Sequence, residues 1–440
     1  MVTHTKKPIK AAKAMIARLM QMRQLWEDAA RNYFEPNRFM LSLQNCITTS
    51  RTVTFILQSN KADIPNFDGW YEPHRQRWSS DPIMRWARDA RNSIEKRGDL
   101  ETHSQIRAEI IASYMKGPET NWVPQALLSS PYAIWRAVPA KFRIPHVLEH
   151  GTLLIERRWV DSELPDMEVL EALAYVYGDF CSTTINFLEA YGIPVPSQLD
   201  RSRPDVMGEL AMDRAIYLSM RDGSTIGNRY YKKPMPAPTG KDKKRILKRY
   251  GKAASWSRLK AAKTFRDVAA AYFENARIIM ARDGFHRNLT FLMKGLLPIE
   301  MVKTDHPDRA SRYVLMRDLA RLAHIAGADG VMTIGEVWTA SNENIPASGF
   351  AVDAPKRGEA INLHAATAQG ESFVMSAKIE RKRPGSKKVM SVSRTEIDED
   401  GFLFMFLPFF EQWGCVDQQA LSKALAQTDE MGIDVPKVGT

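Results

Sequence analysis

The stretch from residue 193 to residue 260 most constrains the fold, because its composition does not favour a compact core. It carries three prolines before residue 205 and the Pro-rich segment Pro234–Pro238, and prolines interrupt both helices and strands. A chain of 440 residues is longer than one ordinary hydrophobic core supports. The sequence therefore predicts two folded domains joined by a Pro-rich and basic linker: residues 11–192, residues 261–440 and, between them, residues 193–260.

The positive charge of the chain is concentrated where this stretch ends. From Arg229 to Lys263 there are thirteen Lys or Arg and one acidic residue, Asp242, so this segment has a net charge of +12. The whole chain has a net charge of +11, so the remaining residues together are near neutral (11 − 12 = −1). Such a run suits phosphate contacts, with Tyr250 and Trp256 available to stack on bases. A solvated linker that docks onto acidic patches of its own protein or of a partner would carry the same charge. The residues predicted here to bind nucleic acid are Lys241, Lys243, Lys244, Arg245, Lys248, Arg249 and Lys252.

Residues 81–99 predict one helix with a defined beginning and end. Asp81 is a suitable N-cap, Pro82 suits the first helical position and Gly98 suits the C-terminal cap. Apolar residues recur at helical spacing on one side: Ile83, Trp86, Ala87, Ala90 and Ile94. The opposite side carries a polar stripe: Arg88, Arg91, Asn92 and Glu95. Arg91 and Glu95 are four residues apart, so an ordinary ion pair on a solvated face is one interpretation of this stripe.

The remainder of the first domain reads as helices around a strand pair. Helices are expected at residues 11–34, 37–59 and 165–191, and a loop with aromatic anchors at residues 64–78. Alternating apolar residues predict strands at 104–114 and 150–160. The predicted fold is an all-α bundle with an inserted β-hairpin.

With these helices and the Arg91-Asn92 pair near the end of one of them, residues 11–192 resemble a HEPN-like domain. The family motif is Arg, a polar residue and, a few residues later, His; Arg91 and Asn92 match, but Lys96 stands where His is expected. The resemblance implies a homodimer that uses this helix, and either a metal-independent ribonuclease or a non-catalytic scaffold. Since His exchanges protons near neutral pH and Lys has a reference pKa of about 10.4, we expect binding by Arg88 and Arg91 without cleavage. If the protein is a nuclease, Arg91, Asn92 and Lys96 are its catalytic residues.

The second domain reads as α+β with a mostly antiparallel sheet. Helices are expected at residues 261–282, 308–326 and 418–426, and strands at residues 288–294, 331–339, 359–366, 372–380 and 389–395. Glu336 lies within one predicted strand and Glu359 opens the next. Two such carboxylates could share a proton or a cation in an active site, or they could face solvent.

Other chemistry is weakly indicated. His146 and His150 are one helical turn apart, but no third ligand accompanies them, so no metal or cofactor is predicted. Cys46, Cys181 and Cys415 are far apart and are expected to be reduced thiols. No apolar run is long enough to span a bilayer, so no membrane partner is expected, and the reduced thiols predict a cytoplasmic protein.

Residues and resemblance together predict a dimeric, non-catalytic nucleic-acid-binding protein, with RNA as the expected partner. It would belong to a bacterial defence, toxin–antitoxin or mobile-element system, and its C-terminal domain would sense or bind a protein partner. Two alternatives remain open at this stage. One is a structural or assembly protein that binds only other proteins, and the other is an active metal-independent ribonuclease.

Overall fold

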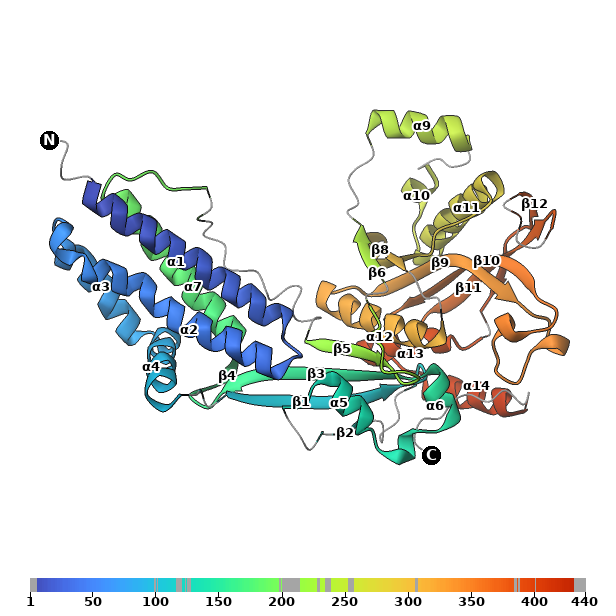
Figure 1. The fold of residues 1–440 in the computed structure, drawn as a ribbon. Helices are drawn as coiled ribbons and strands as arrows, with labels where there is room; N and C mark the ends of the chain where they lie inside the picture. Colours follow the sequence, from blue (N-terminus) through green and yellow to red (C-terminus); the bar gives the residue numbers. More distant parts are fainter. Residues whose placement is uncertain are drawn as a thin grey trace. The chain divides into compact units, whose positions relative to one another are not determined.

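A computed structural model describes residues 6–98, 100, 102–115, 121–122, 124, 128–197, 199, 214–227, 230–233, 239–251, 257–304, 308–383, 386, 388–399 and 401–430. The chain divides into two compact units, each built from several segments (Figure 1). Unit 1 comprises Met1–Glu109, Asn121–Pro139 and Leu153–Leu218, and unit 2 comprises Ile110–Thr120, Ala140–Thr152 and Ser219–Thr440. Helices come first and an antiparallel sheet follows, so the predicted order of a helical and then an α+β region is confirmed. The exact domain boundaries stay a prediction.

Unit 1 is a bundle of long helices. Its helices are α1 (Lys6–Arg31), α2 (Pro36–Ser59), α3 (Phe67–Ser80), α4 (Pro82–Arg97), α5 (Pro131–Arg136) and α7 (Val169–Ala190), with a short 3-10 turn η1 (Lys61–Asp63). Their apolar faces form one core, in which the rings of Phe39 and Trp159 stack 4.5 Å apart and the Trp26 indole donates to the Leu170 carbonyl at 2.8 Å. The predicted helices 11–34 and 37–59 are confirmed as α1 and α2.

Unit 1 also contains a five-stranded sheet, in the order β2-β1-β3-β4 with β5 on β3. The strands are β1 (Thr102–Ile111), β2 (Asn121–Trp122), β3 (Thr152–Asp161), β4 (Leu164–Glu168) and β5 (Ala215–Ser219). The predicted strand pair corresponds to β1 and β3, but the sheet is larger than a hairpin because β5 comes from the stretch predicted to be a linker. Strand β4 also takes the residues predicted to begin the last helix, and α7 begins at Val169 instead.

The loop predicted at residues 64–78 is wrong, because most of it forms α3. Pro73 lies inside this helix and Gly69 in its first turn, and both residues argue for a loop when only local preference is considered. Tertiary packing overrides that preference: Phe67 and Tyr71 are buried, and the Trp78 indole donates to Asp179 of α7 at 2.5 Å.

Unit 2 is built on an eight-stranded sheet in the order β12-β11-β10-β9-β7-β8-β6, with β13 on β11. Its strands are β6 (Tyr230–Lys233), β7 (Leu289–Lys294), β8 (Leu297–Thr304), β9 (Gly330–Thr339), β10 (Gly358–Thr367), β11 (Ser372–Arg381), β12 (Val389–Val392) and β13 (Glu396–Asp398). All of these pairings are antiparallel, as predicted. The four predicted strands at residues 331–339, 359–366, 372–380 and 389–395 are confirmed as β9 to β12.

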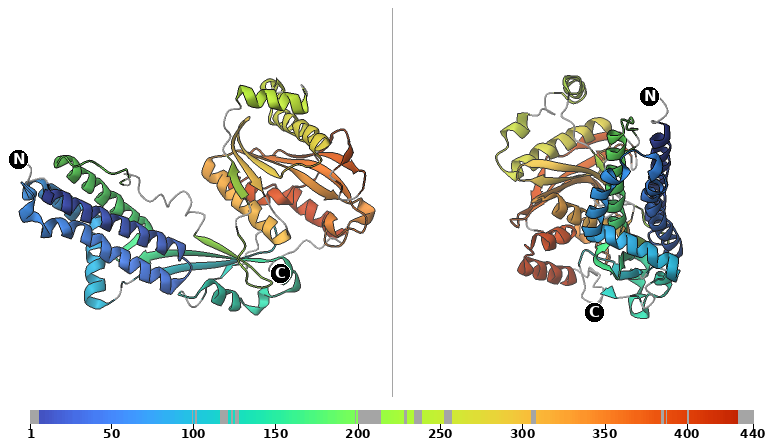
Figure 2. Two further views of the ribbon diagram at one scale, coloured as in Figure 1. Left: turned by 45° about the horizontal axis from the view of Figure 1, so that its top comes forward. Right: turned by 90° about the vertical axis from the view of Figure 1, so that its left-hand side faces the viewer.

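Helices cover both faces of this sheet (Figure 2). On one face α11 packs against Ile334, Ile361 and Phe373; on the other, α12 and α13 pack against Val331 and Ala366. The helices of unit 2 are α6 (Pro145–His150), α9 (Gly240–Tyr250), α10 (Ser257–Ala261), α11 (Phe265–Asp283), α12 (Arg309–Ala326), α13 (Leu407–Trp413) and α14 (Gln418–Glu430). Short 3-10 turns are η2 (Ala140–Phe142), η4 (Asn342–Asn344), η5 (Ala351–Asp353) and η6 (Phe404–Phe406).

The stretch predicted to be a linker contributes ordered elements to both units. Strand β5 joins the sheet of unit 1, whereas β6, α9 and α10 belong to unit 2. Within the described part of the chain, no helix combines the length and the apolar character needed to cross a membrane.

Candidate functional site

Helix α4 forms as its sequence predicts. The Asp81 carboxylate accepts from the backbone N–H groups of Ile83 and Met84 at 2.8 and 3.1 Å, Pro82 occupies the first turn, and Gly98 ends the helix at φ 81°. Trp86, Ala87 and Ala90 are buried in the core of unit 1. The polar stripe consequently lies on the opposite, more exposed side.

The arginines of this stripe are engaged by neighbours on the same helix. The Arg88 guanidinium bonds Asp89 at 2.9 Å, and Arg91 bonds Glu95 at 2.7 Å and Asn92 at 3.0 Å. Lys96 is exposed near the helix end. Exposed pairs of this kind contribute little to stability, and their geometry is that of the solvated face that the sequence offered as the ordinary interpretation.

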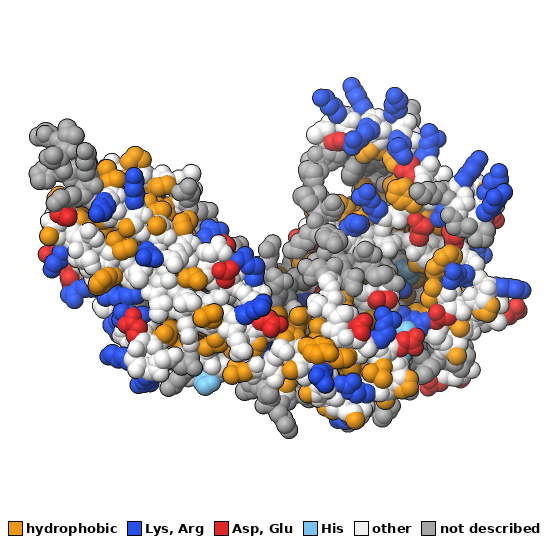
Figure 3. All heavy atoms as spheres, in the orientation of Figure 1, with side chains coloured by type: hydrophobic (Ala, Val, Ile, Leu, Met, Phe, Trp, Pro, Cys, Tyr) orange, Lys and Arg blue, Asp and Glu red, His pale blue; other side chains and the backbone are white. Residues whose placement is uncertain are grey.

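The basic run folds into α9, which is capped at its beginning by reciprocal bonds between Thr239 and Asp242. Asp242, Ile246 and Tyr250 are half-buried on one side, so the cations point elsewhere. Basic side chains gather over this helix in the space-filling view (Figure 3). The predicted nucleic-acid-binding residues that are exposed on α9 are Lys241, Lys243, Lys244, Arg245, Lys248 and Arg249. Lys252 and Trp256 lie outside the described residues.

One acidic residue fixes α9 to the rest of unit 2. Asp283, at the end of α11, accepts from the Arg249 guanidinium at 2.8 Å and from the Tyr250 hydroxyl at 2.7 Å. Burial, and then the bond to this carboxylate, raise the pKa of Tyr250. The Tyr250 ring is therefore part of the attachment of α9, which does not fit the predicted role of stacking on bases. Arg245 pairs with Asp242 at 3.1 Å. Lys241, Lys243, Lys244 and Lys248 have no ion pair with any described residue.

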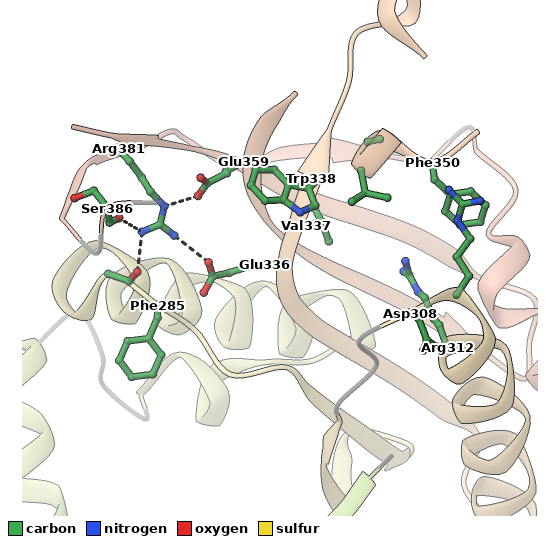
Figure 4. A pocket seen from close by; sticks show the side chains of 14 residues that line it. Phe285, Asp308, Arg312, Glu336, Val337, Trp338, Phe350, Glu359, Arg381 and Ser386 are labelled. Carbon is green, nitrogen blue, oxygen red and sulfur yellow. Dashed lines mark hydrogen bonds and ion pairs between the residues drawn. The ribbon is translucent and has the colours of Figure 1, made fainter. Parts of the chain in front are cut away.

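The two carboxylates singled out in the second domain do meet, and an arginine joins them. Strand register places Glu336 on β9 and Glu359 on β10 on the same face of the sheet, and Arg381 at the end of β11 lies beside them. Arg381 bonds Glu336 at 2.9 Å, bonds Glu359, and donates to the carbonyls of Gly284 and Ser386, each at 2.9 Å (Figure 4).

This Glu–Arg–Glu cluster is better suited to holding the fold than to acid–base work. The Arg381 side chain is 10% exposed, and the second oxygen of Glu336 accepts from the His286 backbone N–H at 2.8 Å. A guanidinium between two carboxylates satisfies charges that would otherwise share a proton or bind a cation. The cluster therefore ties three strands to the turn that follows α11.

The cluster forms one wall of a cavity of about 690 Å³ (Figure 4). The opposite wall is the first turn of α12, with Arg309 and Arg312. The cavity is also lined by the ring of Trp338, beside Glu359, and by the ring of Phe350, against Arg309 (Figure 4). Its volume lies within the range of about 300 to 1,000 Å³ that small-molecule sites occupy.

The two arginines of α12 differ in their partners. Arg309 pairs with Asp353, lies 3.2 Å from the His150 ring nitrogen and stacks 3.9 Å over the Phe350 ring. Arg312, half-buried, has no ion pair with any described residue; its guanidinium bonds the Tyr114 hydroxyl and lies 4.0 Å from the Met405 sulfur. The cavity therefore holds one arginine whose charge is not balanced by a carboxylate in the described structure.

The His146 and His150 pair shows no metal-site geometry. His146 Nε2 lies 2.9 Å from the Ala112 carbonyl oxygen. His150 lies beside Arg309, and the pKa of His150 is lowered mainly by burial and secondly by the Arg309 charge. Among the described residues no group of three or more His, Cys, Asp or Glu side chains could hold a metal ion.

Sequence reasoning did not find the arginines of this cavity, although a signal existed for part of it. Arg309 and Arg312 fall in the first turn of a correctly predicted helix, three residues apart and therefore on one side. Nothing local marks Arg381 or Phe350, because strand pairing and loop packing bring them to the cavity.

A helical unit followed by an antiparallel-sheet unit with a charged cavity defines a two-unit α and α+β protein. The chain belongs to a phage family, because the family model described as bacteriophage lambda protein ea47 matches residues 4–427. Protein ea47 of Escherichia phage lambda is 31% identical over 337 residues, which cover 73% of this chain and 78% of that protein. No solved structure matches.

This family assignment overturns the resemblance to a HEPN-like domain. The match runs through both units of the chain and is to the ea47 family, not to a HEPN-like domain in residues 11–192. The resemblance depended on the order of helices and on the Arg91-Asn92 pair. An Arg-Asn pair near a helix end is a short pattern, and here both side chains belong to the intrahelical network with Glu95.

Proposed function

We propose that this protein binds nucleic acid through α9. The carrying observation is the set of six exposed cations on one short, capped helix, four of which have no ion pair with any described residue. Phosphate groups attract such a surface without regard to base sequence, and each neutralised phosphate releases counterions. The expectation of RNA came with the overturned resemblance, so the proposal covers RNA and DNA alike and assigns no cleavage.

The geometry of α9 supports this function. Lys241, Lys244, Arg245 and Lys248 recur at three- and four-residue spacing and therefore share one side of the helix. The attachment through Asp283 leaves that side uncovered by the described residues of unit 2. A fixed row of cations loses less conformational entropy on binding phosphates than a free chain of the same composition.

The test compares fluorescence anisotropy of labelled single-stranded RNA, single-stranded DNA and duplex DNA with the full-length protein. The α9 variant replaces four lysines or arginines by Gln: Lys241, Lys244, Arg245 and Lys248. The control variant replaces four exposed lysines scattered over the chain by Gln: Lys10, Lys61, Lys356 and Lys423. Both variants lose the same charge, so only the position of the charge differs.

Four phosphate contacts predict a defined salt dependence. Between 50 and 200 mM salt the affinity should fall about 150-fold for duplex DNA and about 50-fold for a single strand. The α9 variant should lose most of this dependence, about one unit of logarithmic slope for each cation removed, and the control should keep it. Absence of binding at 50 mM salt, or equal losses in the two variants, would overturn the proposal. Equal losses in the two variants would favour the alternative function, in which a basic surface binds acidic protein partners.

A further inference from the structure

The cavity of unit 2 has the size and the charge of a site for a small anion that carries a flat ring. One wall is closed by the Glu–Arg–Glu cluster, where Arg381 is satisfied by Glu336 and Glu359. Arg309 on the other wall is satisfied by Asp353. These ion pairs shape the cavity and contribute no free cation to a ligand.

Arg312 is the exception. Its guanidinium is half-buried, lines the cavity and bonds the neutral Tyr114 hydroxyl, and it has no carboxylate partner among the described residues. His364 lies close to it, and burial together with the Arg312 charge lowers the pKa of His364 to about 4, so this histidine is neutral at pH 7. Asp308 is the nearby acid on this wall, and it caps α12 by accepting from the Ser311 N–H at 2.7 Å. A partly desolvated arginine in this setting favours a phosphate or carboxylate oxygen.

Aromatic rings border the rest of the cavity. Trp338 is 43% exposed and Phe285 is 52% exposed, which is high for such large apolar side chains. The Arg357 guanidinium lies 4.2 Å from the Trp338 ring centre and Arg309 lies 3.9 Å from the Phe350 ring centre. Each of these two rings thus carries a cation on one face, and a flat ligand ring would stack against the uncovered surface.

We infer that this cavity binds a phosphate monoester of a nucleoside, with the phosphate at Arg312 and the base against Trp338. The inference goes beyond nucleic-acid binding through α9 and does not depend on it. The same chemistry occurs in a free nucleoside 5′-monophosphate and at the 5′-phosphorylated end of a strand. Either source presents one dianionic phosphate and one base, and a cavity of about 690 Å³ accommodates a ligand of this size.

The test is calorimetric titration of the full-length protein with AMP, GMP, CMP and UMP, with adenosine and with inorganic phosphate. Arg312→Gln should weaken nucleotide binding about tenfold to 100-fold, since it removes a charged hydrogen bond, and should leave adenosine unchanged. Trp338→Leu should weaken adenosine and nucleotides by similar factors and leave phosphate unchanged. Trp338 is exposed, so this variant should fold even if the Arg312 variant does not.

Two further comparisons separate the possible outcomes. The α9 variant should keep full nucleotide affinity, which distinguishes this site from the proposed nucleic-acid surface. Competition between AMP and a 5′-phosphorylated oligonucleotide, but not its 5′-hydroxyl counterpart, would identify the strand end as the source; without competition the source is the free nucleotide. The inference fails if none of the four nucleotides binds at millimolar concentration, or if binding is insensitive to both Arg312→Gln and Trp338→Leu.

Discussion

Glu168 in unit 1 is predicted to make the protein less stable as the pH rises. This carboxylate is completely buried and caps α7 by accepting from the backbone N–H groups of Leu170 and Glu171 at 2.9 and 3.2 Å. Arg214 is 3.9 Å away and favours the charged form. Burial nevertheless dominates and raises the pKa of Glu168 from 4.5 to about 7.

The sign follows from proton linkage. Between pH 4.5 and pH 7 the folded protein holds a proton on Glu168 that the unfolded chain has lost, so the free energy of unfolding falls as the pH rises through this window. The full effect is about 3 kcal/mol, and about 2.5 kcal/mol of it falls between pH 5 and pH 8. Glu168→Gln removes the titration and keeps an acceptor oxygen for the helix cap. Relative to wild type, the variant should therefore gain about 2.5 kcal/mol between pH 5 and pH 8.

The measurement is urea unfolding of wild type and Glu168→Gln at pH 5, 6, 7 and 8. Hydrogen exchange of amides in α7 assigns the change to unit 1, because local stability can differ between units. Glu163→Gln, at an exposed carboxylate, controls for the loss of one charge. A difference between Glu168→Gln and wild type that stays constant over this pH range, or that moves in the opposite direction, would refute the reasoning.

Two other substitutions test the contacts that organise each unit. Arg381→Met should lower the free energy of unfolding by about 3 to 5 kcal/mol, because it leaves Glu336 and Glu359 without their shared cation, and adding Glu336→Gln and Glu359→Gln should restore part of the loss. If the changes in the free energy of unfolding simply add in the triple variant, as measured by urea unfolding, the three residues do not form a shared network. Asp81→Ala should lower the free energy of unfolding by about 1 to 2 kcal/mol, because it removes the cap of α4 and the hydrogen bond from the Tyr175 hydroxyl. An unchanged hydrogen-exchange rate of the α4 amides would count against this role.

Local sequence was enough to locate many elements. Helix α4 was predicted from Asp81, Pro82 and Gly98, each of which acts on backbone groups within one turn of itself. The strands β9 to β12 were predicted as short strand-like runs, and in β9 and β10 the apolar residues of these runs pack into cores on both faces of the sheet. Where long-range packing opposed local preference, as for α3 with Pro73 inside it, the prediction was wrong.

The candidate sites likewise combine features that local sequence predicts with features that depend on contacts between distant residues. The basic character of α9 was evident from the residues themselves, whereas the part that Tyr250 takes in attaching α9 to Asp283 was not, because the two residues are 33 positions apart. The resemblance to another family failed for a related reason. It compared the order of helices and one residue pair, and neither carries information about what those side chains contact.

The sequence by itself determined the order of the two structural classes, the ends of several helices and the place where the positive charge is concentrated. These properties depend on residues within a few positions of one another, so composition and periodicity are sufficient to predict them. Only the tertiary structure decided that the stretch around residues 215–250 is shared between two units, that Arg381 joins Glu336 to Glu359, and that Arg312 faces a cavity without a described carboxylate partner. Glu336 and Arg381 are 45 residues apart, and strand register, set by the burial of whole strand faces, places them in contact.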